Sequence, residues 1–234
     1  MEKDLFVLIF ILSIAVFCFA ILLFILFPKK GGTLITADFF PKQVDNDQND
    51  GYRCELNFNR TLKYFIGKDD YLISNVLLKN KKETVGEIDT ILISRKGIFC
   101  IEIKNTRGSG KGRESTLHWK FRKNPDAKGY TRVENPVMQN ERHIEIFKKI
   151  FGFNYFVNNV VVFPNAFSLN NVVSDKVYKL DTFLKYIGSL KDDKLTKKEI
   201  LMIVDRLCDY NSTVLGFKSI KHLTKEQMCR FQLS

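Results

Sequence analysis

Three ionisable side chains interrupt two neighbouring apolar segments in the middle of the chain. Residues 86–94 and 97–105 are rich in β-branched and apolar residues, and a short turn joins them. This pattern predicts a β-hairpin whose strands are buried on both faces, as in the centre of a covered sheet. Asp89, Glu102 and Lys104 nevertheless lie within it. Ionised groups are seldom buried without a partner or a metal ion, so these three residues are the first candidates for chemistry.

The register of the hairpin decides whether these side chains can act together. Pairing of Ser94 with Gly97 would place Asp89 opposite Glu102, on one face of the sheet. Lys104 would share that face, and a shift of one residue would separate the two carboxylates unless a bulge restored the register. Two carboxylates at close range repel each other, which favours a divalent cation between them. The alternative is a buried salt-bridge cluster with no catalytic role.

Seven short motifs around these residues follow one another along the chain. In order they are Gly51-x-x-x-Glu55, Glu87-Ile88-Asp89, Gly97-Ile98-Phe99, Glu102-Ile103-Lys104-Asn105, Gly108, Trp119 and Asn135-Pro136-Val137-x-Gln139. This ordered set resembles the nuclease-related domain (NERD) family, a branch of the PD-(D/E)xK nuclease superfamily that is often fused to membrane helices. The resemblance covers residues 50 to 185. It departs from the family at Cys54, where a glycine often precedes the glutamate.

The resemblance implies a fold, a reaction and a set of site residues. The fold is α/β, a restriction-endonuclease-like mixed β-sheet flanked by helices, and the reaction is phosphodiester hydrolysis in DNA or RNA. The implied catalytic residues are Asp89, Glu102, Lys104 and Gln139. Asp89, Glu102 and Glu55 would hold Mg²⁺ or Mn²⁺, which suits a set of oxygen ligands. From the residues alone, Glu55 could equally complement a helix dipole, and Gln139 could be a solvated helix residue.

A strongly basic stretch follows the hairpin. From Lys104 to Arg132 there are nine Lys or Arg residues against two acidic ones, a net charge of +7. The candidates for binding nucleic acid are Arg107, Lys111, Arg113, Lys120, Arg122 and Lys123. Aromatic residues interleave with them, as phosphate neutralisation and base stacking require, although Trp119 is better interpreted as a buried strand residue. The glycines of 108–112 lack the spacing of a phosphate-binding loop and are interpreted as a flexible turn.

The N-terminal segment has the length and composition of a membrane anchor. Residues 5–27 carry no charge, and at about 1.5 Å per residue they can cross a hydrocarbon core about 30 Å thick. A secretory signal is the rival interpretation, but it needs a shorter apolar region and a basic head. Lys29 and Lys30 follow the segment, against Lys3 before it. The positive-inside rule therefore predicts a single-pass cell-membrane protein whose C-terminal domain is cytoplasmic.

The overall charge favours an anionic partner. The net charge is +11, and the residues after 27 carry +12 because Glu2, Lys3 and Asp4 contribute −1. Nucleic acid and the anionic inner leaflet of the membrane are both suitable partners, while solvation of the surface is the simpler explanation. None of the five cysteines has the spacing of a disulfide framework or a zinc site.

The expected organisation is a transmembrane helix at 5–27, a linker at 28–50, the nuclease-related domain at 51–187 and a C-terminal helical extension at 188–234. Expected helices are 51–66, 182–187, 196–210 and one that opens at Asn135-Pro136; expected strands are 70–79, the hairpin, 160–164 and 177–180. Three functions fit these features: a membrane-anchored magnesium-dependent nuclease, a catalytically silent tethered module that binds nucleic acid or a partner, and a scaffold that lies on anionic lipid. The oligomeric state is left open.

Overall fold

A six-stranded mixed sheet forms the centre of the computed structural model, which describes residues 31–36, 46–80, 83–124, 126–152 and 154–214. The predicted hairpin is confirmed: its strands are β3 (Glu83–Ser94) and β4 (Gly97–Ile103), and every residue of β4 is buried. The strand order is β1-β2-β3-β4-β8-β10. The other strands are β1 (Thr33–Thr36), β2 (Tyr71–Asn80), β8 (Val157–Val162) and β10 (Val177–Tyr178).

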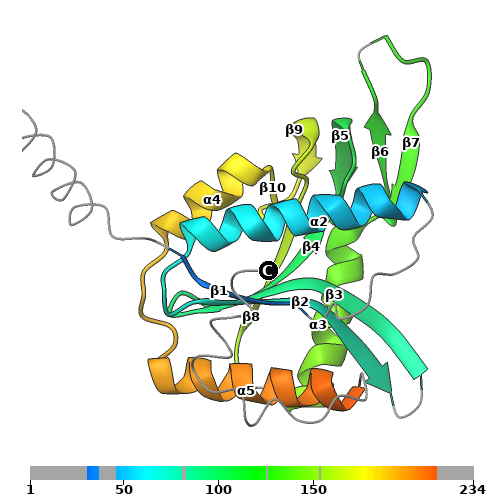
Figure 1. Ribbon diagram of the computed structural model, residues 1–234. Helices are drawn as coiled ribbons and strands as arrows, with labels where there is room; N and C mark the ends of the chain where they lie inside the picture. The colour runs from blue at the N-terminus through cyan, green and yellow to red at the C-terminus, as the bar shows by residue number, and fades with distance from the viewer. Residues whose placement is uncertain (1–30, 37–45, 81–82, 125, 153, 215–234) are drawn as a thin grey trace, which may run out of the picture.

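Four helices cover the two faces of this sheet (Figure 1). They are α2 (Asn46–Phe65), α3 (Pro136–Phe151), α4 (Leu180–Ser189) and α5 (Lys197–Val214). Because side chains alternate along a strand, Leu92 and Phe99 pack beneath α2 and α4, whereas Ile91 and Ile98 pack against α3 and α5. The predicted burial of both faces of the hairpin is therefore confirmed, and it explains why its strands are apolar at odd and even positions.

A second, four-stranded sheet stands beside the first one (Figure 1). Its order is β7-β6-β5-β9, and its strands are β5 (Gly108–Arg113), β6 (His118–Arg122), β7 (Thr131–Glu134) and β9 (Ala166–Val173). The prediction of a flexible turn at 108–112 is thus wrong, because this glycine-rich segment is a strand. The interpretation of Trp119 as a buried strand residue is confirmed, since its exposed fraction is 0%.

The glycines of β5 make room for two aromatic rings of β6. A Cβ atom on Gly112 would lie 2.3 Å from the Trp119 ring, and one on Gly110 would lie 2.8 Å from the Phe121 ring. Both rings also stack on Phe163, at centroid distances of 6.4 and 5.0 Å. The glycines therefore let the second sheet bury its aromatic face, and its opposite face is left to polar residues.

Two predicted boundaries need correction. The segment 28–50 is not wholly a linker, because β1 lies within it and pairs in parallel with β2, and α2 begins at Asn46. Strand β1 has only four residues, which are too few to show an alternation of apolar and polar side chains. Acidic residues do not exclude the start of α2, because the helix dipole favours them in a first helical turn. The helix predicted in the extension at 188–234 belongs to the main core, since α5 buries Ile200, Ile203 and Leu207 against the central sheet.

The predicted starts of α3 and α5 are confirmed by their caps, whereas α4 begins at Leu180, two residues before its predicted start. The Asn135 side chain accepts hydrogen bonds from the backbone N–H groups of Val137 and Met138 at the start of α3. Thr196 and Glu199 form a capping box before α5, in which the Glu199 carboxylate accepts from Thr196 N–H at 2.8 Å. The predicted transmembrane helix at 5–27 lies outside the described residues. Among the helices that the structure describes, none is both long and apolar enough to span a membrane.

The close approach of Trp119 to β5 gives a stability prediction. Gly112→Ala should lower the free energy of unfolding by about 1–3 kcal/mol, because the added methyl group would overlap the indole ring and force the strands apart. The matched control is Gly129→Ala, since a Cβ atom there meets nothing within 4 Å. Urea denaturation of the two variants measures the difference. Equal midpoints would show that this packing does not constrain the second sheet.

Candidate active site

The hairpin register brings the candidate residues to the same end of the sheet. Ser94 pairs with Gly97 and the ladder runs to Thr90 opposite Ile101, as the favoured register required. Asp89 and Glu102 follow directly beyond that last pair. Here the Oδ2 atom of Asp89 accepts a hydrogen bond of 2.7 Å from the backbone N–H of Ile103. The carboxylate of Asp89 is thereby oriented across the strand gap toward β4.

Glu102 and Lys104 form an ion pair in the interior of the protein. The Nζ atom of Lys104 lies 2.6 Å from Oε1 of Glu102, and the side chain of Glu102 is only 2% exposed. Its other oxygen, Oε2, is buried and has no hydrogen-bond partner among the described residues. A buried carboxylate with one unsatisfied oxygen is costly. A further cation or hydrogen-bond donor is therefore expected beside Oε2 of Glu102.

Electrostatics show that three carboxylates share this end of the sheet. The pKa of Asp89 is raised well above its usual value, first by burial and then by the charges of Glu102 and Glu55, while the Ile103 N–H and Lys104 oppose the rise. Mutual repulsion of this kind disappears when a divalent cation binds between the carboxylates. The charges of Glu102 and Glu55 therefore both act on Asp89 in the folded protein.

Glu55 reaches the site from α2 rather than from the sheet. One helical turn later, Asn59 is buried and its Oδ1 atom accepts a hydrogen bond of 2.7 Å from Thr90 of β3. This contact fixes the helix over the strand that carries Asp89. The neighbouring Cys54 is no nucleophile at neutral pH, because burial and then the charge of Glu55 raise the pKa of its thiol to about 11.

Helix α3 supplies the residues on the other side of Glu102. Asn140 is fully buried, and its amide donates hydrogen bonds to the Cys100 carbonyl at 2.9 Å and to Asn159 at 2.8 Å. This anchor places His143, whose Nδ1 atom lies 3.8 Å from Oε2 of Glu102. Burial lowers the pKa of His143. Gln139 is half-buried on α3 and lies four residues before His143, on the same side of the helix.

Neither His143 nor Asn140 is among the site residues that the sequence predicts. A signal for Asn140 was present, because it occupies the apolar stripe of α3 together with Ile144, Phe147 and Phe151. An amide in such a stripe must find buried partners. Neither the Cys100 carbonyl nor Oε2 of Glu102 could be assigned to α3 from sequence, since strands β5, β6 and β7 separate the helix from the hairpin along the chain.

The predicted nucleic-acid-binding residues belong to the second sheet and its connections. Lys111 pairs with Lys120, which pairs with Arg132, so three cations lie side by side across β5, β6 and β7. All three are exposed, on the face opposite the buried rings of Trp119 and Phe121. We call them the cation row. Arg132 was absent from the predicted set because only the strand register shows that it joins this row.

The remaining predicted cations surround this row without joining it. The guanidinium of Arg122 lies 4.8 Å from the centre of the Tyr130 ring, and Nζ of Lys120 lies 6.0 Å from it. Exposed residues Arg107, Arg113 and Lys123 occupy the connections and the end of β5. A surface hollow of about 520 Å³ adjoins the cation row and is lined by Thr116, Leu117, His118, Lys120 and Arg132. The structure thus places the acidic and basic candidates on different sheets.

The donor set fits magnesium better than a softer metal. In the part of the chain that the structure describes, no three His, Cys, Asp or Glu side chains are already grouped at metal-binding distances. Magnesium needs no such cage, because it is commonly held by one or two carboxylates together with water and substrate phosphates. Asp89 and the unsatisfied Oε2 of Glu102 provide that minimum, with Glu55 nearby.

Comparison with known proteins agrees with this geometry. Residues 50–164 match the family model described as nuclease-related domain. The Bacillus anthracis protein pXO1-01 is 28% identical to this chain over 157 residues, which cover 64% of this chain and 71% of that protein. No solved structure matches the chain. The mixed α/β architecture fits a nuclease-like fold, and the PD-(D/E)xK superfamily is consistent with the matched family. Through residues 50–164, the chain belongs to the nuclease-related domain (NERD) family.

Proposed function

We propose that this chain is a membrane-anchored nuclease that hydrolyses phosphodiester bonds of DNA or RNA with Mg²⁺ or Mn²⁺. One observation carries the proposal: Glu102 is 2% exposed, pairs with Lys104 through one oxygen and leaves the other unsatisfied beside Asp89. A purely structural ion pair would be expected to satisfy both oxygens, because each unsatisfied buried group costs about 1–3 kcal/mol.

Each side chain at the site has a definable task. Asp89 and Glu102, assisted by Glu55, would hold the cation. When bound, this ion polarises the phosphoryl oxygen and lowers the pKa of a water molecule. Lys104 directly follows β4 and lies beside Glu102. It would stabilise the negative charge that develops on the phosphate. Gln139 lies on the α3 side of the site and would contact phosphate or orient the attacking water.

Removal of the charged groups should abolish cleavage without unfolding the domain. Asp89→Ala and Lys104→Ala should each lower the rate of metal-dependent nicking of a plasmid or cleavage of RNA by at least about 100-fold, because each removes a group that acts on the reacting phosphate. The matched controls are Glu145→Ala and Lys149→Ala, which remove exposed charges from α3. Cleavage is compared with Mg²⁺, with Mn²⁺ and with chelator. Equal rates for wild type and both site variants would remove the assignment.

The cation row is the proposed binding surface for the substrate backbone. Like charges directly opposite in a sheet destabilise it by themselves, so three adjacent cations favour an anionic ligand over them. Tyr130, which is 53% exposed beside Arg122, adds a ring on which a base can stack. The surface hollow beside the row provides the space for a phosphate chain.

Neutralising the cation row should weaken binding while leaving the chemistry intact. The triple variant Lys111→Ala/Lys120→Ala/Arg132→Ala should reduce the slope of log affinity against log salt by about 2–3, since each phosphate contact contributes about 1. Binding is measured by gel shift in chelator, and the rate at saturating substrate should stay near wild type. A control triple variant removes exposed cations elsewhere: Lys149→Ala/Lys185→Ala/Lys198→Ala. An equal loss of affinity in both triple variants would contradict a dedicated face.

The separation of the two sheets also supports a second candidate function. The cation row needs no carboxylate and no metal to attract nucleic acid, so the domain could bind without cutting. A salt-sensitive gel shift, together with no cleavage by wild type under any metal condition, would favour this binding module.

Membrane attachment forms part of the proposal. It is supported by the uncharged run at residues 5–27 and by Lys29 and Lys30 after it, which favour a cytoplasmic domain at the cell membrane. A scaffold lying on anionic lipid is the alternative. It would require vesicle binding by the folded domain without any affinity for nucleic acid.

The raised pKa of Asp89, caused first by burial and then by the neighbouring carboxylates, predicts how its contribution to stability depends on pH. Between about pH 4 and the raised value, this carboxyl binds more protons in the folded protein than in the unfolded chain. The stability that Asp89 contributes therefore falls as pH rises through this interval. Asp89→Asn removes the effect, so in chelator the variant should be more stable than wild type at pH 7.5 and about equal below pH 4.

Addition of Mg²⁺ should reverse that ranking, because wild type gains binding energy that the variant lacks. Urea denaturation at the two pH values, with and without metal, measures both effects. The control is Asp126→Asn, which changes an exposed carboxylate. A wild-type protein more stable than Asp89→Asn in chelator at pH 7.5 would contradict the predicted repulsion.

A further inference from the structure

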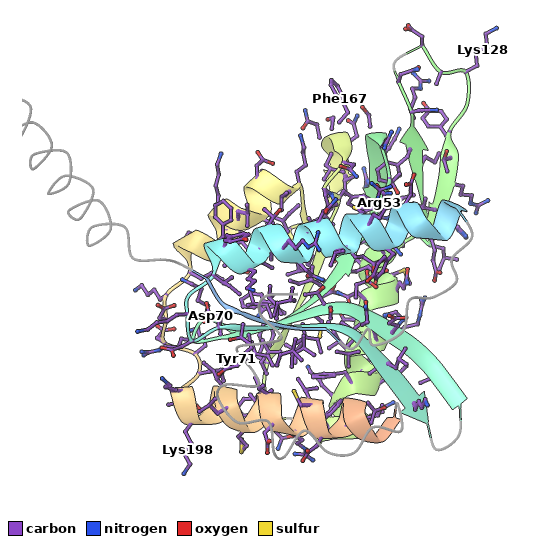
Figure 2. The ribbon with its side chains drawn as sticks, in the orientation of Figure 1. Arg53, Asp70, Tyr71, Lys128, Phe167 and Lys198 are labelled. Atoms are coloured by element: carbon purple, nitrogen blue, oxygen red, sulfur yellow. The ribbon has the colours of Figure 1, made fainter. Side chains whose placement is uncertain are left out.

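The chain enters the central sheet at the end of the strands that lies away from the candidate active site. Thr33 of β1 pairs with Tyr71, Tyr71 pairs with Ile93, and Ile93 pairs with Ile98. These four residues form one row beside the β3–β4 turn. We call this end of the sheet the turn edge. Figure 2 places Tyr71 there, and places Phe167 of β9 at the opposite end of the molecule.

The strand geometry sets the distance between the turn edge and the site. Glu102 lies four positions after Ile98 along β4, a distance of about 13 Å at about 3.3 Å per residue. Lys104 lies two residues farther in the same direction. Asp89 and Glu102 therefore lie toward the end of the sheet away from the entering chain.

The entering chain is short and is fixed to the folded domain. The backbone N–H of Gly32 donates a hydrogen bond of 2.9 Å to the Lys63 carbonyl at the end of α2. The proposed membrane segment ends at Phe27, five residues earlier. Five extended residues reach at most about 17 Å, so the turn edge cannot move far from the end of the membrane segment.

The turn edge carries basic side chains for which the described part of the chain shows no ion pair. Its loops are joined through Lys194 N–H, which donates to the Arg95 carbonyl, and through the Lys197–Asp69 ion pair at 3.0 Å. Among the described residues, no carboxylate lies within ion-pair distance of five of its basic side chains. These are Lys63, Lys68, Arg95, Lys191 and Lys198. Unpaired cations near a short membrane tether match the negative charge of an anionic leaflet.

Two exposed aromatic residues stand beside these cations. Tyr64 and Phe65 end α2 directly after Lys63, and their exposed fractions are 70% and 58%. On the other face of the same helical turn, Leu62 is fully buried. Aromatic rings next to Lys and Arg are typical of the interfacial layer of a membrane, where the rings enter the headgroup region and the cations contact lipid phosphates.

We propose that the turn edge lies against an anionic bilayer, with Tyr64 and Phe65 in the headgroup layer and the candidate active site turned away from the lipid. The inference rests on the membrane anchor of the proposed function, but it does not depend on cleavage. In this orientation the carboxylates and the cation row face the aqueous phase, where a nucleic-acid chain can reach both.

The orientation can be measured with two matched tryptophan variants of the full chain. Phe65→Trp adds a ring at the turn edge, and Phe167→Trp adds one at the opposite end, where Phe167 is 76% exposed. The native Trp119 is fully buried and contributes the same background to both. Each variant is reconstituted into phosphatidylserine vesicles whose acyl chains carry bromine, a short-range quencher. Phe65→Trp should lose about half or more of its added emission, and Phe167→Trp should lose little.

Charge reversal provides a second arm. Lys68→Glu/Lys191→Glu in the Phe65→Trp background should reduce the quenching, and neutral phosphatidylcholine vesicles should do the same. Tyr64→Trp repeats the measurement at the neighbouring position. A chain that does not co-float with vesicles would overturn the anchor and the orientation together. A chain that co-floats but shows equal quenching at both positions, or no quenching at residues 64 and 65, would overturn the orientation alone.

Discussion

The burial of Glu102 is the constraint on which the rest of the site depends. A carboxylate in the centre of a strand buried on both faces loses its hydration and must recover that energy from nearby groups. Lys104 supplies one charge at 2.6 Å, and His143 stands 3.8 Å from the second oxygen. The structure therefore keeps the Glu102 carboxylate away from water and pairs it with one cation. An isolated pair of apolar side chains would pack there at lower cost, so this arrangement is better explained by chemistry than by stability.

Two anchors outside the hairpin keep this arrangement in place. Asn59 ties α2 to β3 through Thr90, and Asn140 ties α3 to β4 and β8 through backbone and side-chain oxygens. Both asparagines are buried, so their hydrogen bonds cannot be exchanged for water without cost. Each of the two helices is therefore fixed to one strand of the hairpin, α2 to β3 and α3 to β4. Glu55 and His143 reach the carboxylates from opposite faces because each lies about one helical turn from its anchor.

What could be predicted from the sequence follows from local rules. The short turn before Gly97 fixed the hairpin register, and the register placed the carboxylates together, because strand geometry has a period of two. Caps located α3 and α5 for the same local reason. Strand β5 escaped prediction because its glycines have no strand preference of their own. Trp119 and Phe121 hold them extended from six or more residues away. The environments of Asn140 and His143 were not predicted because their partners Cys100 and Glu102 are separated from α3 by three strands along the chain.

The direction in which the site faces follows from the order of the strands. An antiparallel hairpin places its turn at one end of its ladder, and here Asp89 and Glu102 lie just beyond the last residue pair at the other end. Strand β1 runs parallel to β2 and therefore enters at the same edge as the β3–β4 turn. Exchanging the direction of either pairing would bring the entering chain beside Glu102. The topology itself thus separates the entering chain at one end of the strands from Glu102 toward the other by about 13 Å, before any surface residue is considered.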